Sequence, residues 1–331
     1  MKYWLSKISR VEVKPRPSGI DLRYSEWIRP PKFIRKFLKT LVWQDFVQYP
    51  DTNLLRDRIA LHHNVNKENI FLGPGSAECI KAVFECFTAS ESVLVSEPCF
   101  PMYNVYAEQT GIHINHIQAE SNLTYANEKW HGCNFTIVTR PSSPLGHCFS
   151  KEEIINILRK NIDRWVLVDE AYIGYAEGQE DIVDLINIYK NLIVCRSFSK
   201  TFGAAGIRVG YLLSCAENIK IISKFRQMYE VTGPSLRYAI YLLDNHIEVE
   251  RYCTDTILER KKLCKLFENS GYAVVSSQGN WIHIEQKEPL MDILKIHNIH
   301  VKDNIQLPYS EHKWIRLTVC PGLSRIFKKI L

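Results

Sequence analysis

Residues 197–211 have the sequence SFSKTFGAAGIRVGY, and this segment says more about the chain than any other. An apolar run precedes it and predicts a buried strand, so Lys200 comes just after a strand end. Two hydroxyls, Ser197 and Ser199, stand close before this lysine, and Arg208 follows among small residues that permit a tight turn. An amine, two hydroxyls and a guanidinium in one loop suit a ligand that carries both an aldehyde and a phosphate.

Pyridoxal phosphate is a ligand of this kind, and it binds proteins as a Schiff base with a lysine. The segment resembles the cofactor-lysine signature of class I/II aminotransferases, which have the type I fold of pyridoxal-phosphate enzymes. It is most similar to the histidinol-phosphate aminotransferase branch of that family. The resemblance implies that Lys200 binds the cofactor covalently and that Ser197, Ser199 and Arg208 bind its phosphate.

Two other interpretations of the segment were weighed. The spacing Ser-x-x-Lys is also found where a serine nucleophile is activated by a lysine, here Ser197 and Lys200. That chemistry expects Ser-Asp-Asn and Lys-Thr-Gly partners, and neither tripeptide occurs in the chain. The plainest alternative is a strand-to-loop turn with a surface lysine, which the length of the signature disfavours.

Composition narrows the class of protein. The chain has 331 residues, 46% of them apolar, with a net charge of +6. These values predict a folded protein, and the mild charge favours neither nucleic acid nor a membrane as a partner. There is no apolar stretch long enough for a membrane span and no secretory signal, so we expect a cytoplasmic protein.

Cysteines and histidines give no sign of a metal site. The ten cysteines include no Cys-x-x-Cys, and most lie in apolar runs, which predicts buried free thiols in a reducing compartment. The eleven histidines show no ligand spacing, and the pair His62-His63 is expected on the solvated surface.

The central part of the chain alternates short apolar runs with helical patterns, which predicts an α/β fold with a doubly wound, mostly parallel sheet. Further along, residues 216–245 are expected to form long helices. By resemblance we assign residues 46–240 to a large cofactor-binding domain and residues 1–45 and 241–331 to a smaller α+β domain. The expected strands are 92–96, 112–118, 135–139, 165–169, 192–196, 209–214, 280–284 and 314–319.

A glycine-rich turn precedes a helix with an apolar stripe. Glycines such as Gly75 let the backbone approach an anion, and a helix start offers free N–H groups. Alone, such a turn is weak evidence for an anion site, because Ser76 could simply cap the helix. The turn matches the phosphate loop of the family, so the resemblance implies phosphate contacts by Gly75, Ser76 and Ala77.

The run Val166-Leu167-Val168-Asp169-Glu170-Ala171-Tyr172 is the second strong motif. Asp169 ends a predicted buried strand, where α/β folds bind ligands, and a buried carboxylate is costly unless it meets a cation. A protonated pyridine nitrogen is such a cation, and the pairing keeps the ring an electron sink. The resemblance gives this role to Asp169 and gives Tyr172 a hydrogen bond to the ring oxygen.

Three other positions follow from the resemblance. Phe100 matches the aromatic residue that stacks on the pyridine ring. Tyr49, in Tyr-Pro-Asp, matches a tyrosine that reaches the cofactor phosphate across a dimer interface, which implies a homodimer. Ser143 stands where the family usually has the asparagine that binds the ring oxygen, because Arg140-Pro-Ser-Ser-Pro-Leu-Gly146 replaces Asn-Pro-x-Asn-Pro-Thr-Gly. A hydroxyl is a shorter donor, so the ring oxygen would depend more on Tyr172.

Substrate binding is assigned to the C-terminal part of the chain. Arg316, in Trp-Ile-Arg-Leu-Thr-Val, matches the arginine that binds the acidic group of the substrate. Lys302 takes the place of a second arginine of the histidinol-phosphate branch, so the charge is kept and the planar fork is lost. The usual N-terminal Glu-Asn-Pro-x-Gly-Pro lid is also absent, which argues against histidinol phosphate itself as the substrate.

The resemblance therefore implies a pyridoxal-phosphate-dependent aminotransferase with small-molecule amino donors and keto acceptors. Lys200, Asp169 and Tyr172 are the expected catalytic residues, and the substrate is a small amino acid or a phosphorylated amine or keto compound. The alternative is a decarboxylase of a phosphorylated amino acid such as threonine phosphate or phosphoserine. A cofactor-binding regulator without turnover is a third possibility, but the sequence leaves no room for a DNA-binding domain.

Overall fold

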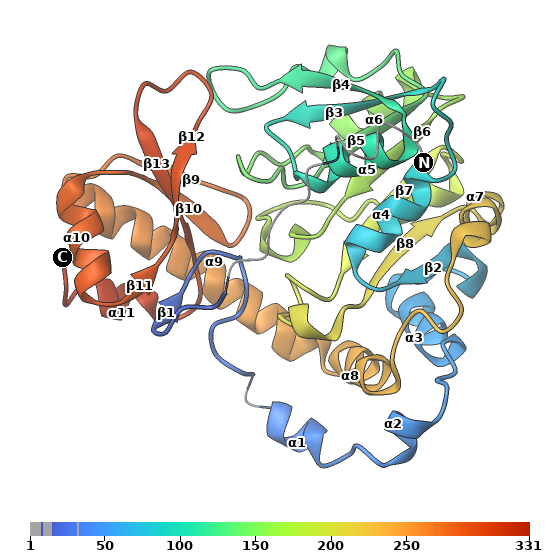
Figure 1. Ribbon diagram of the computed structural model, residues 1–331, viewed down its shortest axis with the longest axis horizontal. Coiled ribbons are helices and arrows are strands. Elements are labelled where there is room, and N and C mark those ends of the chain that lie inside the picture. The colour runs from blue at the N-terminus through green and yellow to red at the C-terminus, as the bar shows by residue number, and fades with distance from the viewer. Residues whose placement is uncertain (1–7, 9–14, 32) are drawn as a thin grey trace.

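The computed structural model describes most of the chain and contains two main sheets and a two-stranded pair, β1 with β11 (Figure 1). A large sheet has seven strands and a smaller one has four. Part of the expected N-terminal arm lies outside the described residues, which are 8, 15–31 and 33–331.

The seven-stranded sheet is mostly parallel, as the sequence predicted. Four neighbouring pairs are parallel, and only β8 runs antiparallel to its neighbours β2 and β7. Its order is β2-β8-β7-β6-β5-β3-β4. The strands are β2 (Ile70–Gly73), β3 (Ser92–Glu97), β4 (His113–Gln118), β5 (Phe135–Thr139), β6 (Trp165–Asp169), β7 (Leu192–Ser197) and β8 (Gly210–Ser214).

Helices cover both faces of this sheet, which explains why its strands are apolar along their whole length. Val166 and Val168 of β6 belong to one apolar cluster and Leu167 to the other, as alternation along a strand requires. The first cluster includes side chains of α3 (Asn53–His63), α6 (Lys151–Lys160) and α8 (Gly233–Asp244). The second includes side chains of α4 (Ser76–Phe84), α5 (Met102–Thr110) and α7 (Ala216–Ile222).

The smaller sheet is antiparallel and has two unlike faces. One face packs its apolar side chains on α9 (His246–Asn269), α10 (Glu288–Ile296) and α11 (Leu323–Phe327). Because strand residues alternate, the other face carries Trp281, His283, Arg316 and Thr318. Its strands are β9 (Val274–Ser276), β10 (Trp281–Glu285), β12 (Lys302–Gln306) and β13 (Lys313–Thr318).

The N-terminal arm contacts this small sheet before it reaches the rest of the chain. Strand β1 (Ile20–Asp21) pairs in parallel with β11 (Ile299–His300). Further along, the hydroxyl of Thr318 donates to the carbonyl of Leu22 at 2.6 Å, and the N–H of Ser25 donates to the same hydroxyl at 3.0 Å. These bonds place the arm over the polar face of β13.

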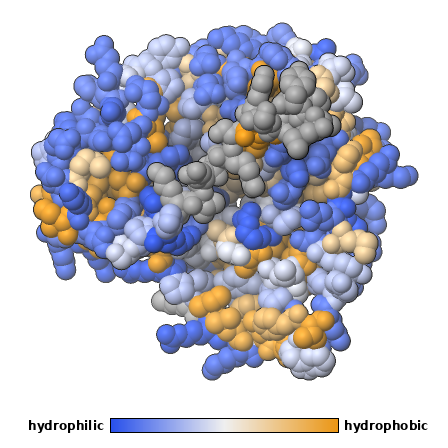
Figure 2. Space-filling view, in the orientation of Figure 1, coloured by the Kyte–Doolittle hydropathy of each residue, from blue (hydrophilic) through white to orange (hydrophobic). Residues whose placement is uncertain are grey.

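Two short helices, α1 (Ile34–Leu38) and α2 (Gln44–Val47), lie beyond the arm and apart from both sheets (Figure 1). Phe37 of α1 packs on Tyr238 and Tyr241 of α8. Their outer surface is apolar, visible as the orange patch at the bottom of Figure 2. The residues of this patch, each 48–78% exposed, are Leu38, Val42, Trp43, Phe46, Val47 and Tyr49.

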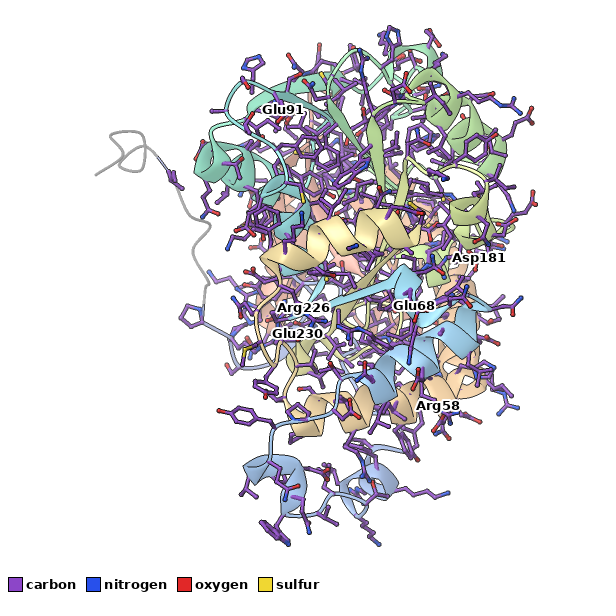
Figure 3. The ribbon with its side chains drawn as sticks, turned by 90° about the vertical axis from the view of Figure 1, so that its right-hand side faces the viewer. Arg58, Glu68, Glu91, Asp181, Arg226 and Glu230 are labelled. Atoms are coloured by element: carbon purple, nitrogen blue, oxygen red, sulfur yellow. The ribbon has the colours of Figure 1, made fainter. Side chains whose placement is uncertain are left out.

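The prediction of long helices over residues 216–245 is confirmed for α7 and α8 and is wrong for the segment between them. A short 3₁₀ helix, Ser223–Phe225, follows α7, and beyond it Tyr229 has a φ of +55°, which a helix does not allow. The next residue, Glu230, is buried and forms ion pairs with Arg226 at 3.7 Å and with Arg56 at 3.1 Å. Figure 3 shows Arg226 and Glu230 close together in this segment.

The helices and the cysteines bear on membrane spans and disulfide bonds. Among the described residues, no helix has both the length and the apolar character of a membrane span. All ten cysteines are free thiols, as predicted.

Candidate active site

The carboxylate of Asp169 lies at the end of β6, buried and 5% exposed. It accepts hydrogen bonds from the hydroxyl of Tyr103 at 2.7 Å and from the N–H of Ala171 at 3.1 Å. Burial raises the pKa of Asp169, and these two bonds oppose the rise. No cation among the described residues lies within ion-pair distance, so the site offers a buried anion that lacks a counterion.

Lys200 lies in the turn after β7, the strand paired in parallel with β6. Its amine donates to the carbonyl of Tyr24 in the N-terminal arm at 2.6 Å. The same amine is 5.7 Å from the centre of the Tyr172 ring. The backbone carbonyl of Lys200 accepts from the hydroxyl of Tyr175 at 2.9 Å, and that hydroxyl also accepts from the indole N–H of Trp27. The lysine is therefore held between the large sheet and the arm.

An anion cradle forms where Arg208 meets the start of α4. Gly75 has a φ of +89°, and a side-chain carbon there would lie 2.3 Å from the guanidinium of Arg208. A side-chain carbon at Gly210 would likewise lie 2.3 Å from the nitrogen of Ser76, so β8 also approaches closely. Glycines at these two positions allow the guanidinium and the helix start to converge.

The charge of this cradle is positive and uncompensated. Arg208 donates to the hydroxyl of Ser199 at 3.4 Å and to the carbonyls of Ala205 and Pro74 at 3.2 and 3.4 Å. Among the described residues, no carboxylate pairs with it. The first N–H groups of α4, which include those of Ser76 and Ala77, have no carbonyl partner within the helix. The cradle therefore suits a phosphate.

The hydroxyl groups before the lysine differ in their contacts. Ser197 is buried, and its hydroxyl accepts from the N–H of Ser199 at 3.0 Å. Ser143 is half-buried in the turn after β5, at the same edge of the sheet, and its hydroxyl makes no hydrogen bond with the described residues. Hydrogen bonds thus connect Ser197 and Ser199 to the cradle, but none connects Ser143 to another described residue.

Aromatic side chains connect the two sheets at this edge. Tyr172 packs edge-to-face on Trp281 of β10, with ring centres 4.9 Å apart. The same indole lies 5.8 Å from the guanidinium carbon of Arg316. On the large-sheet side, Phe100 is 37% exposed and packs edge-to-face on Tyr103 at 5.5 Å. One chain of contacts therefore runs from Tyr172 through Trp281 to Arg316, and a second runs from Asp169 through Tyr103 to Phe100.

Arg316 is 9% exposed and has no carboxylate partner among the described residues. One of its terminal nitrogens donates to the carbonyl of Arg23 at 3.2 Å, while its Nε has no partner there. Burial lowers the pKa of Arg316. On neighbouring strands, Lys302 and His283 lie directly opposite it. Burial and the charge of Arg316 also lower the pKa of Lys302.

A cavity of about 560 Å³ lies beside these cations. Its wall carries Arg316 and Lys302 together with Tyr24, whose carbonyl contacts Lys200. Lys295 of α10 and Arg23 of the arm add further positive charge, and Arg23 is paired with Asp21 at 2.8 Å. The positive wall of this cavity therefore suits an anionic molecule.

Tyr49 does not join this group within one chain. Its ring is 78% exposed and stacks on Tyr229 with ring centres 4.0 Å apart. The sequence prediction for this residue depends on a partner subunit and stays a prediction.

Sequence reasoning missed two residues of the site. Tyr103, fully buried, donates to Asp169, and Trp281 lies between Tyr172 and Arg316. Tyr103 had a signal, because it follows Phe100 by three residues, which is about one helical turn. Trp281 had none, because only the fold brings the small sheet to Tyr172.

Residues 21–325 match the family model of aminotransferase class I and II, so the chain belongs to this family. Its relatives include histidinol-phosphate aminotransferases of Acinetobacter baylyi and Caldanaerobacter subterraneus. The first is 30% identical over 71% of this chain and 66% of its own length, and the second is 33% identical over 71% and 68%. The matched part thus spans about two thirds of these relatives.

Solved structures agree on the fold. The histidinol-phosphate aminotransferase of Sinorhizobium meliloti, in complex with pyridoxal-5′-phosphate, has a TM-score of 0.86 at 18% identity, covering 98% of this chain and 94% of that one. The L-threonine-O-3-phosphate decarboxylase of Porphyromonas gingivalis has a TM-score of 0.77 at 19% identity, covering 92% and 98%. The family, the type I fold and pyridoxal phosphate as the cofactor are confirmed.

Proposed function

We propose that this chain is a pyridoxal-phosphate-dependent aminotransferase for a small anionic amino acid or a phosphorylated amine or keto compound. One observation carries the proposal. Lys200 follows β7, beside the strand that ends in the buried carboxylate of Asp169, and Ser199 of the same turn contacts Arg208 of the positive cradle. The aldehyde, the pyridine nitrogen and the phosphate of the cofactor match these three groups.

The residues fit the cofactor as follows. Gly75, Ser76 and Ala77 with Arg208 and the serine hydroxyls would bind the phosphate. Asp169 would pair with the ring nitrogen, which also relieves the cost of its burial. Tyr172 and Ser143 would donate to the ring oxygen, and Phe100 would cover the ring face. The bound cofactor supplies an electron sink for a carbanion at the substrate α-carbon.

Lys200 then has two tasks. Its amine would hold the cofactor at the aldehyde carbon until a substrate amine replaces it. The same amine would serve as the general base for the proton on the substrate α-carbon and would deliver it to the C4′ carbon of the cofactor. Tyr24, whose carbonyl accepts from this amine, would help to orient it.

Arg316 and Lys302 would bind the acidic group of the substrate. A buried guanidinium with no carboxylate partner is costly, and an anionic ligand removes that cost. The planar fork of Arg316 suits a carboxylate or phosphate, while Lys302 adds a point charge from the facing strand.

The test uses purified protein with pyridoxal phosphate and a panel of amino donors that includes phosphoserine and phosphothreonine. Keto-acid formation from a donor is the expected result. Carbon dioxide release instead of keto acid would establish the decarboxylase alternative. The absence of both products would refute catalysis. Lys200→Ala should lower turnover at least about 10⁴-fold. The exposed Lys220→Ala, on α7, serves as the matched control.

The functional unit would be a homodimer in the cytoplasm. The apolar patch on α1 and α2, which ends at the exposed Tyr49, is suited to burial against a second copy. Light scattering should give twice the chain mass, and Trp43→Asp should give a monomer. Tyr49→Phe should weaken cofactor binding without changing the mass. A monomeric wild-type protein would contradict the proposal.

A further inference from the structure

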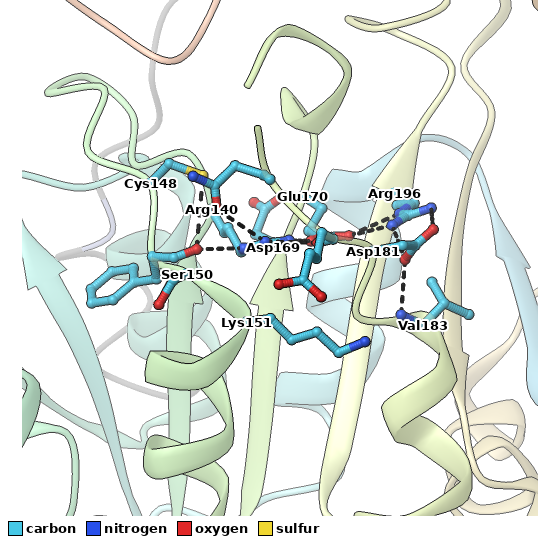
Figure 4. A network of polar contacts seen from close by, with 12 residues as sticks. Arg140, Cys148, Ser150, Lys151, Asp169, Glu170, Asp181, Val183 and Arg196 are labelled. Atoms are coloured by element: carbon cyan, nitrogen blue, oxygen red, sulfur yellow. Dashed lines mark hydrogen bonds and ion pairs between the residues drawn. The ribbon is translucent and has the colours of Figure 1, made fainter. Parts of the chain in front are cut away.

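Four charged side chains form a network behind the candidate active site (Figure 4). Glu170 is fully buried and binds one arginine with each carboxylate oxygen. Its Oε1 accepts from Arg140 at 2.5 Å, and its Oε2 accepts from Arg196 at 2.7 and 2.9 Å. Arg196 also donates to Asp181 at 2.8 Å, so two positive and two negative charges balance.

His63 belongs to the same network, so the expectation of solvated surface is wrong for His63, although His62 is exposed. Its Nδ1 lies 3.3 Å from Arg196, and its Nε2 lies 2.9 Å from the hydroxyl of Tyr211. Burial and the neighbouring guanidinium lower the pKa of His63 to about 2, so the ring adds no charge.

Two members of the network, Glu170 and Arg196, are next to residues of the proposed cofactor site. Glu170 follows Asp169, and Arg196 precedes Ser197. Successive residues of extended chain point to opposite faces, so a contact that fixes one also fixes its neighbour. Backbone bonds reinforce this: the N–H of Arg140 donates to the carbonyl of Asp169 at 2.8 Å. The ends of β5, β6 and β7 are therefore held together from behind.

Arg140 also closes the loop that carries Ser143. Its Nε donates to the carbonyl of Phe149 at 2.7 Å, and a terminal nitrogen donates to the carbonyl of Glu180 at 2.9 Å. Both ends of loop 140–149 are thus fixed by one side chain. In the motif that this loop resembles, asparagine stands at the position of Arg140, and the same loop carries the shorter serine at 143. A fixed loop leaves this shorter side chain less freedom to move away from its target.

We propose that Glu170 is a positioning residue for the cofactor, acting through Arg140 and Arg196 on the three strand ends. The inference rests on the proposed function, because it assumes that Asp169, Ser197 and Ser143 contact pyridoxal phosphate. Glu170 itself touches neither cofactor nor substrate.

The test is Glu170→Gln in the full chain, with cofactor-free protein titrated with pyridoxal phosphate. We expect the cofactor to bind about 10- to 100-fold more weakly, as for other residues that support ligating groups. We also expect the visible absorbance of the bound cofactor to titrate at lower pH, because two arginines then face one remaining carboxylate. Asp184→Asn, which removes the exposed pair with Lys151 at 2.8 Å, is the control and should match wild type.

The double variant Arg140→Gln, Glu170→Gln separates position from charge and guards against misfolding of the single variant. It restores charge balance, so its absorbance should titrate near the wild-type pH, while cofactor binding stays weak. Wild-type affinity in the folded double variant, or in Glu170→Gln, would overturn the positioning role whatever happens to stability. A wild-type protein that binds no cofactor would instead refute the proposed function and this inference with it.

Discussion

Two buried arginine clusters in this molecule differ in one respect, which is whether their charges are paired. Behind the large sheet, Arg140 and Arg196 share Glu170, and Arg196 also binds Asp181. On the small sheet, Arg316 lies between Lys302 and His283 and has no carboxylate among the described residues. Burying the charges costs desolvation free energy in both clusters. Only in the first cluster do ion pairs within the chain offset this cost.

The difference separates a structural role from a binding role. The charges of a paired cluster balance without a ligand. Removing one of them is therefore expected to change first the stability of the fold and the positions of neighbouring residues. An unpaired cation is completed only by a ligand, so its loss is expected to show in binding. The same reasoning applies to Asp169, an unpaired buried anion opposite a cofactor cation.

Of the changes to these two clusters, Arg316→Met should have the largest effect on catalysis. Removing a buried charge that binds the substrate is expected to lower kcat/KM about 100- to 1000-fold. The melting temperature should stay level or rise, because an unpaired buried cation is gone. Arg325→Met, at an exposed position on α11, is the control. A fall in stability with little change in kcat/KM would reverse the comparison.

Arg196→Met should have the largest effect on stability. It leaves Glu170 and Asp181 with fewer positive partners, and breaking such a buried pair costs about 3–5 kcal/mol of unfolding free energy. Guanidinium denaturation of the cofactor-free protein measures this directly. A loss below 1 kcal/mol would mean that the cluster does not stabilise the large sheet.

His283→Leu should make the protein more resistant to acid. Burial and Arg316 lower the pKa of His283 to about 3, and neither ring nitrogen has a partner among the described residues. A group with a lowered folded pKa contributes stability above its unfolded pKa, near 6.5, and loses it as the pH falls towards 3. The loss is about 2 kcal/mol at pH 5, which the leucine variant should not suffer.

Denaturation at pH 7.5 and pH 5 tests this, with the exposed His297→Leu as the control. Equal acid sensitivity of wild type and His283→Leu would show that the imidazole does not stay neutral in the folded protein.

Asp169→Asn should have a smaller effect on stability, and the pH dependence of that effect should be opposite to that of His283. Burial raises the folded pKa of Asp169, so its stability contribution is present below the unfolded pKa, about 3.9, and is lost as the pH rises through the folded value. At pH 7 the cofactor-free variant should therefore melt higher than wild type, while binding pyridoxal phosphate more weakly. A lower melting temperature without cofactor would argue that this carboxylate is already paired.

The paired and unpaired clusters also differ in how far sequence could predict them. Lys200 and Asp169 each follow an apolar run that predicts a buried strand. A polar residue at the end of such a strand can be recognised from that one stretch of sequence. The strands that precede them were predicted to within one residue. Strand β2 was missed, because Ile70–Gly73 is short and directly precedes the glycine turn.

The network around Glu170 could not be predicted in this way. Its members come from separate segments, around positions 63, 140, 170, 181 and 196, and no spacing relates them. The error over residues 216–245 has a related cause. Phe225, Met228 and Tyr229 keep a helical spacing, but they are exposed, so the apolar stripe did not mark a core-facing helix.

The contact between Tyr24 and Lys200 has a practical consequence for anyone who prepares this protein. The polypeptide ahead of the large sheet supplies an acceptor to the very nitrogen on which the chemistry depends. Truncating this segment for expression, or fusing an affinity tag close to it, would therefore alter the surroundings of the reactive amine.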